Sequence, residues 1–196
     1  MRRALTFLLV FVCSYACAQT DSLKIFNNAR YRTTKTGMEV LGSWGLANIG
    51  VGVAGWTSSA GGDNKYFYQM TTIWGAANFG AAILGFTGNK NKTLNKTGSL
   101  NAQKKIERIF LINAGLDVAY IGTGLILQSK GNNGKSSNPA QLRGYGSSII
   151  MQGAFLLLFD STMYGAERFN GNKLRRFLQK NPITFNGKTV GLIYNM

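Results

Sequence analysis

Long apolar runs separated by short polar connectors dominate the chain from residue 38 onward. Four runs are about twenty residues long, which is the length a helix needs to cross the hydrocarbon core of a bilayer. They lie at residues 38–56, 66–86, 109–127 and 146–164. None contains proline, and all are rich in glycine, alanine and bulky apolar residues. The pattern predicts an all-α fold, a four-helix transmembrane bundle within a domain of residues 37–165.

The N-terminus has the three parts of an export signal. A positively charged start and an apolar run over residues 5–12 precede Ala16-Cys17-Ala18, which matches an A-x-A cleavage site. We therefore expect residues 1–18 to be a signal peptide that is cleaved after Ala18, followed by a polar N-terminal segment, residues 19–36. The alternatives are lipid attachment at Cys17 and an uncleaved anchor.

A short basic tail, residues 166–196, follows the fourth run. Its first part, residues 168–180, is amphipathic and suits contact with an anionic membrane surface. Residues 183–194 have the pattern of a β-hairpin with a turn at Asn186-Gly187. An isolated hairpin is marginally stable, so this one needs a surface to pack on.

The first two runs are related by an internal repeat with a period of thirty residues. Residues 42–50 (GSWGLANIG) align with residues 72–80 (TIWGAANFG). A nine-residue connector, 57–65, makes the two helices antiparallel neighbours, so we expect the copies to face each other. Small residues would let the backbones approach closely, and the asparagines would lie at similar depth. The expected packing residues are Trp44, Trp74, Gly45, Gly75, Gly50 and Gly80.

Polar side chains follow one face of each of the last two runs, and each face includes a carboxylate. An ionised carboxylate at the bilayer centre costs about 2.5 to 3.5 kcal/mol, so it normally faces the bundle interior. We expect an intramembrane polar pocket for a cation, a proton or a polar solute. The alternative is that these groups only cross-link the helices, at about 0.6 kcal/mol each. The expected members are Asn48, Asn78, Asn113, Asp117, Tyr120, Gln152, Asp160 and Tyr164.

The amino-acid composition excludes most kinds of catalytic site. The chain has no histidine, and its only cysteines, Cys13 and Cys17, lie within the expected signal. A mature chain of this kind has no disulfide, no Cys or His zinc site, no Ser-His-Asp triad and no Cys nucleophile. The acids are scattered, so we expect no catalytic residue, no metal site, no cofactor and no enzymatic activity.

The net charge of +15, from 22 Lys and Arg against 7 Asp and Glu, indicates an anionic partner. No helix-turn-helix pattern, zinc-finger spacing or RNA-binding motif accompanies the charge, so we expect anionic lipid head groups and no nucleic acid. Solvated loops are the alternative. A homo-oligomer or other membrane proteins are further expected partners, in a bacterial inner membrane reached by signal-directed export.

Two features of the sequence predict opposite orientations of the chain in the membrane. A cleaved signal starts the mature chain outside, and four crossings then leave the basic segment 87–108 and the basic tail outside as well. The positive-inside rule prefers the opposite placement. A soluble bundle whose helices are buried all round is the remaining alternative to a membrane protein.

The paired Trp-Gly-x-Ala-Asn motifs at residues 44–48 and 74–78 and the Asp117-x-x-Tyr120 helix accompany a signal that ends in Ala-Gln-Thr. Together they resemble an uncharacterised group of small four-helix membrane proteins found in Bacteroidota. The resemblance covers most of residues 37–165 and implies a fold and a membrane, but no activity. We expect a non-enzymatic structural or interaction component of the membrane. The alternative is a small-solute, cation or proton transporter or channel subunit that uses the polar layer.

Overall fold

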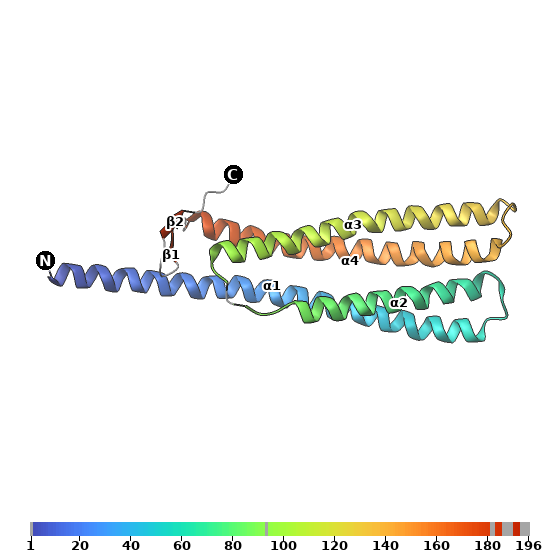
Figure 1. Cartoon of the computed structure of the whole chain (residues 1–196), viewed down its shortest axis with the longest axis horizontal. Coiled ribbons are helices and arrows are strands. Elements are labelled where there is room, and N and C mark those ends of the chain that lie inside the picture. The colour runs from blue at the N-terminus through green and yellow to red at the C-terminus, as the bar shows by residue number, and fades with distance from the viewer. Residues whose placement is uncertain (1, 93, 181–182, 186–189, 193–196) are drawn as a thin grey trace. The chain divides into compact units, whose positions relative to one another are not determined.

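The computed structural model describes residues 2–92, 94–180, 183–185 and 190–192, with side chains over residues 22–92 and 94–180. In these residues it has four helices and two short strands (Figure 1). They are α1 (Arg2–Ser58), α2 (Gly62–Gly88), α3 (Lys96–Asn132), α4 (Pro139–Lys180), β1 (Ile183–Phe185) and β2 (Val190–Leu192). Each predicted apolar run lies inside one helix, so the expected all-α bundle is confirmed.

Three of the helices extend well beyond the apolar runs. Helix α1 includes the segment expected to be merely polar, residues 19–36, because its buried positions recur every three or four residues, as in one face of a helix. The expected signal, residues 1–18, falls in the part of α1 whose side chains lie outside the described residues. The buried positions of α1 are Leu23, Asn27, Arg30, Thr34, Gly37, Leu41, Gly45, Asn48 and Gly52.

The chain divides into two compact units. Unit 1 comprises Met1–Thr33, Lys90–Glu107 and Ala166–Met196, and unit 2 comprises Thr34–Asn89 and Arg108–Gly165. Helices α1, α3 and α4 contribute residues to both units, whereas α2 belongs to unit 2 alone.

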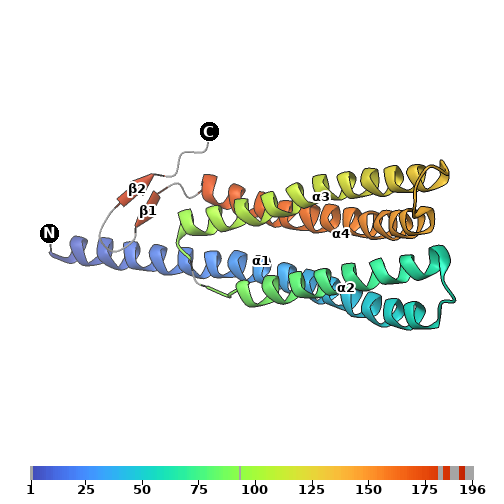
Figure 2. The same ribbon diagram turned by 45° about the vertical axis from the view of Figure 1, so that its right-hand side comes forward.

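In unit 2, α1 runs beside α2 and α3 runs beside α4, each pair antiparallel (Figures 1 and 2). Small residues set both contacts: a Cβ at Gly45 would lie 2.8 Å from the carbonyl oxygen of Gly75, and one at Gly124 would lie 2.7 Å from that of Gly146. The turn between α1 and α2 places Gly61 at a φ of 126°, a conformation that side chains with a Cβ rarely adopt.

Unit 1 holds a small apolar core inside a polar surround. Leu23 of α1, Leu100 of α3, and Leu174 and Leu178 of α4 form this core. Strands β1 and β2 pair antiparallel, as the predicted hairpin requires. Its expected turn, Asn186-Gly187, lies outside the described residues.

Two of the described helices, α3 and α4, are long and apolar enough to cross a membrane, by length and composition alone. The sequence predicted four such helices. Helices α1 and α2 do not reach the mean hydropathy that a membrane span requires. Their apolar runs contain many glycine, threonine, asparagine, tryptophan and tyrosine residues, which lower the mean.

Candidate functional site

Three amide side chains, Asn48 of α1, Asn78 of α2 and Gln152 of α4, form an amide cluster inside unit 2. The Nε2 atom of Gln152 donates to Oδ1 of Asn48 at 2.6 Å. Its Oε1 accepts from Nε1 of Trp44 at 2.9 Å and from Nδ2 of Asn78 at 3.4 Å. Gln152 is fully buried, so its bonds join three helices away from solvent. The amide cluster thus satisfies its own polar groups.

The repeat brings its tryptophans and two of its glycines to helix contacts. Trp44 stacks on Phe155 of α4 with ring centroids 3.9 Å apart, and Trp74 meets Tyr120 of α3 edge-on at 4.9 Å. Gly45 and Gly75 face each other where α1 crosses α2, so the two copies of the repeat are in contact.

Gly50 and Gly80, the other two repeat glycines expected to pack, do not lie in the contact between α1 and α2. A Cβ at Gly50 or Gly80 would meet nothing within 4 Å, so the close packing expected there is not found among the described residues. Both residues fall between the buried positions of their helices and so lie off the contact face. The thirty-residue repeat alone does not distinguish glycines in the helix contact, Gly45 and Gly75, from glycines outside it, Gly50 and Gly80.

Asp117 of α3 and Asp160 of α4 form a second buried group, the acid pair. They are 2% and 4% exposed. Their carboxyl groups interact with each other, and the side chain of Asn113 interacts with Asp160. One oxygen of each carboxyl, Oδ2 of Asp117 and Oδ1 of Asp160, has no hydrogen-bond partner. Among the described residues, these are the only buried side-chain nitrogen or oxygen atoms without a hydrogen-bond partner.

No basic side chain compensates the acid pair. The other two acids of unit 2 have partners: Glu39 lies 3.7 Å from Lys35, and Asp63 lies 2.7 Å from Arg143. Among the described residues, neither member of the acid pair has a Lys or Arg nitrogen within 4 Å. The interacting side chains are therefore Asp160 for Asp117, and Asp117 and Asn113 for Asp160.

The single polar pocket expected from sequence is thus two groups with separate partners. Gln152 and Asp160 are eight residues apart on α4, which is about 12 Å along a helix. The amides of α1 and α2 bond Gln152 rather than Asp117. Tyr120 packs on Trp74, and no contact places Tyr164 with either group.

The register of the antiparallel helices α3 and α4 decides whether the two aspartates can meet. A Cβ at Gly153 of α4 would lie 3.2 Å from the backbone oxygen of Asp117, and Asp160 lies seven residues, or about two turns, further along α4. Sequence periodicity describes each helix separately and does not contain this register.

An ion pair that sequence reasoning missed closes one end of unit 2. Arg143 donates to Asp63 through Nε at 2.7 Å and through Nη2 at 2.9 Å, and its Nη1 donates to the carbonyl oxygen of Gly131 at 3.1 Å. These bonds hold the pKa of Asp63 below its ordinary value and raise the pKa of Arg143. The pair joins the start of α2, the start of α4 and the end of α3.

Unit 1 contains a denser polar interior. Buried Gln103 of α3 donates to both the backbone and the side chain of Glu167 of α4. Arg168 and Arg175 each lie 3.1 Å from Glu107. Burial lowers the pKa of Arg30, and the nearby charge of Glu167 opposes this shift. Polar bonds as well as leucines hold these helices together.

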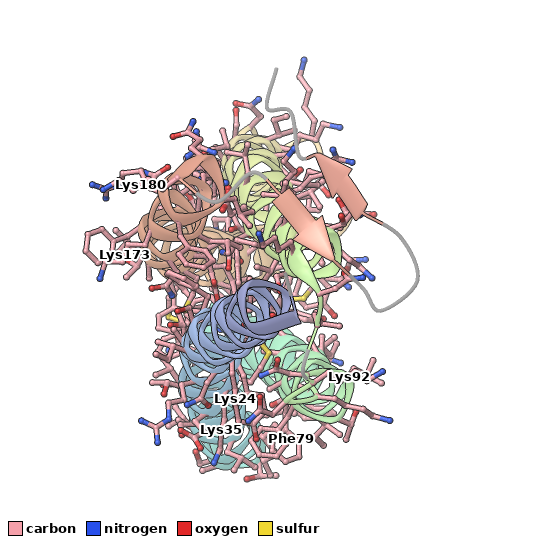
Figure 3. The ribbon with its side chains drawn as sticks, turned by 90° about the vertical axis from the view of Figure 1, so that its left-hand side faces the viewer. Lys24, Lys35, Phe79, Lys92, Lys173 and Lys180 are labelled. Atoms are coloured by element: carbon pink, nitrogen blue, oxygen red, sulfur yellow. The ribbon has the colours of Figure 1, made fainter. Side chains whose placement is uncertain are left out.

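Charge is divided unequally between the units. Unit 1 has sixteen Lys and Arg against three Asp and Glu, a net charge of +13, and unit 2 has six against four, a net charge of +2. Lys173 and Lys180 project outward from α4 in Figure 3. Nearly all of the basic excess belongs to unit 1.

These features define an all-α protein whose four helices enclose buried amides and acids. The chain belongs to DUF6992, a family of unknown function, whose match covers residues 40–161 and so includes the amide cluster and the acid pair. The expectation of an uncharacterised family is thereby confirmed. No curated protein and no solved structure matches the chain. Among the described residues, no three His, Cys, Asp or Glu gather in a group that could hold a metal ion.

Proposed function

We propose that this chain is a multi-pass integral membrane protein that crosses the bilayer at residues 38–56, 66–86, 109–127 and 146–164. Its role is that of a non-enzymatic structural or interaction component. A place in the bacterial inner membrane, in contact with anionic lipid head groups, fits this role.

The observation that carries the proposal is the inverted distribution of side chains in unit 2. Nineteen large apolar side chains are exposed among the described residues, and seventeen of them lie within these four segments. Soluble monomers rarely expose large contiguous apolar patches, although single exposed apolar residues are normal. The same segments bury Asn48, Thr71, Asn78, Asp117, Ser148, Gln152 and Asp160. Apolar groups outside and polar groups inside suit hydrocarbon as the solvent.

Chain connectivity supports the role of the head groups. Unit 1 consists of the segments before the first crossing, between the second and third, and after the fourth. An even number of crossings separates these segments, so all three would lie on one side of the membrane. A net charge of +13 beside one leaflet favours anionic lipids, at about 1 kcal/mol for each basic residue near the surface.

A matched pair of lysine substitutions tests the proposal. Val118 is 57% exposed at the middle of the third segment, and Ile25 is 68% exposed in unit 1. In a membrane, Val118→Lys costs about 2.5 to 3.5 kcal/mol of insertion free energy, whereas Ile25→Lys is tolerated. We expect V118K, and not I25K, to lose full-length protein from the carbonate-washed membrane fraction. Equal tolerance of both, with a monodisperse chain in detergent-free buffer, would contradict the proposal.

A second function, transport of a proton, a cation or a small solute, is favoured by one observation. The acid pair is buried and carries two oxygens without partners, unlike the internally satisfied amide cluster. Groups that served only as helix cross-links would be expected to bond fully. Four helices leave little room for a conduction path, so transport would require several copies.

A further inference from the structure

We propose that Asp117 and Asp160 together hold one exchangeable proton between α3 and α4. The inference rests on the proposed membrane location and deepens the second function named above. It separates the acid pair, as a binding site, from the amide cluster, as a helix cross-link.

The contact between the carboxyl groups carries the first step. If both were ionised, their two negative charges would repel each other in an interior that screens charge less than water does. A single proton between them replaces that repulsion with a strong, charge-assisted hydrogen bond. The protons of such a pair belong to the pair rather than to either residue.

The surroundings carry the second step. From α3 the pair faces Asn113, which is neutral, and the charge acting on Asp160 comes from Asp117. From α1, Lys35 and Glu39 pair with each other, and from α2, Asp63 pairs with Arg143 of α4. With no basic partner among the described residues, a proton is the cation available to the pair from water at ordinary pH.

The unpartnered oxygens carry the third step. A permanently neutral cross-link would be most stable with every oxygen bonded, yet Oδ2 of Asp117 and Oδ1 of Asp160 are both buried and both without a partner. Each can accept a proton or a transient water. A transient water at either oxygen gives the proton a route to and from the pair.

Infrared spectroscopy of the full-length chain in detergent micelles tests the inference, because a protonated carboxyl has its own C=O stretch. Between about pH 4 and about pH 10, where exposed carboxyls are mostly ionised, we expect a band that weakens as pH rises and shifts in D2O. Asp117→Asn and Asp160→Asn should each move its midpoint to lower pH, because the remaining carboxyl no longer faces a second negative charge. Asp63→Asn is the matched control and should leave it unchanged.

Three outcomes would overturn the inference: no such band, a band that does not change with pH, or a band displaced by sodium ions at constant pH. The last would identify a metal-cation site instead. If either variant fails to accumulate, labelling the aspartate side-chain carboxyls with carbon-13 in the native chain still assigns the band, since the chain has only four aspartates. The comparison of V118K with I25K leaves both members of the acid pair in place, so it tests the membrane proposal separately from the proton site.

Discussion

At the scale of single residues, the repeat glycines supply a matched set for testing the contact between α1 and α2. A Cβ at Gly45 or Gly75 would lie 2.7 Å from a backbone nitrogen of the other helix, whereas Gly50 and Gly80 have open space. We expect Gly45→Ala and Gly75→Ala to destabilise the fold by about 1 to 3 kcal/mol through overpacking. Gly50→Ala and Gly80→Ala should be neutral or stabilising by up to about 1 kcal/mol.

Thermal unfolding of the four variants in detergent measures the difference. If all four alanine variants melt together, the packing of the repeat is not the one described. A loss of stability confined to Gly50→Ala and Gly80→Ala would instead indicate that a second copy of the chain uses these outer faces.

Residue types were easier to predict from the sequence than their partners. The cost of burying polar groups among apolar neighbours singled out Asn48, Asn78, Asp117 and Asp160 correctly as interior residues. Their pairing depends on the register between helices, which sequence periodicity does not contain. Asp117 was therefore expected beside the asparagines, although Gln152 occupies that position.

At the scale of elements, the helices followed from their apolar runs, but their ends did not. In unit 1 the buried face includes Asn27, Arg30 and Gln103, so a hydrophobic pattern does not reveal it. The bond from Gln103 to Glu167 replaces apolar contact. Polar side chains at helical spacing are read as solvent-exposed unless their partners on other elements are known.

Gln152 allows the linkage between helices to be measured. Gln152→Leu removes a partner from Trp44, Asn48 and Asn78 at once. At about 0.6 kcal/mol for each hydrogen bond inside a membrane protein, we expect a loss of about 2 kcal/mol. Gln128→Leu is the control: Gln128 donates one bond, to Ser147, so its loss should be about a third as large.

Unfolding of the two variants by titration with a denaturing detergent gives these free energies. Equal losses would mean that the amide cluster adds nothing beyond an ordinary polar contact. A larger loss for Gln128→Leu would contradict the assignment of Gln152 as the link among α1, α2 and α4.

At the scale of the whole molecule, the division of charge bears on orientation. The three segments of unit 1 carry a net charge of +13. The positive-inside rule counts basic residues in short segments near the ends of spans, so it places these segments in the cytoplasm. A cleaved export signal would place them outside. The two expectations exclude each other.

Because unit 1 gathers nearly all of the excess charge, we expect the rule to prevail and residues 90–107 to be cytoplasmic. Lys105→Cys in unit 1 and Ser136→Cys in the connector between α3 and α4 report opposite sides, with the chain lacking an added cysteine as the blank. A membrane-impermeant maleimide applied to intact cells should label S136C at once and K105C only after permeabilisation. The reverse pattern, with an intact mass reduced by residues 1–18, would mean that the signal sets the orientation. Without Arg2 and Arg3, unit 1 would carry a net charge of +11, and this charge would face the outer leaflet, where anionic lipid would have to be sought.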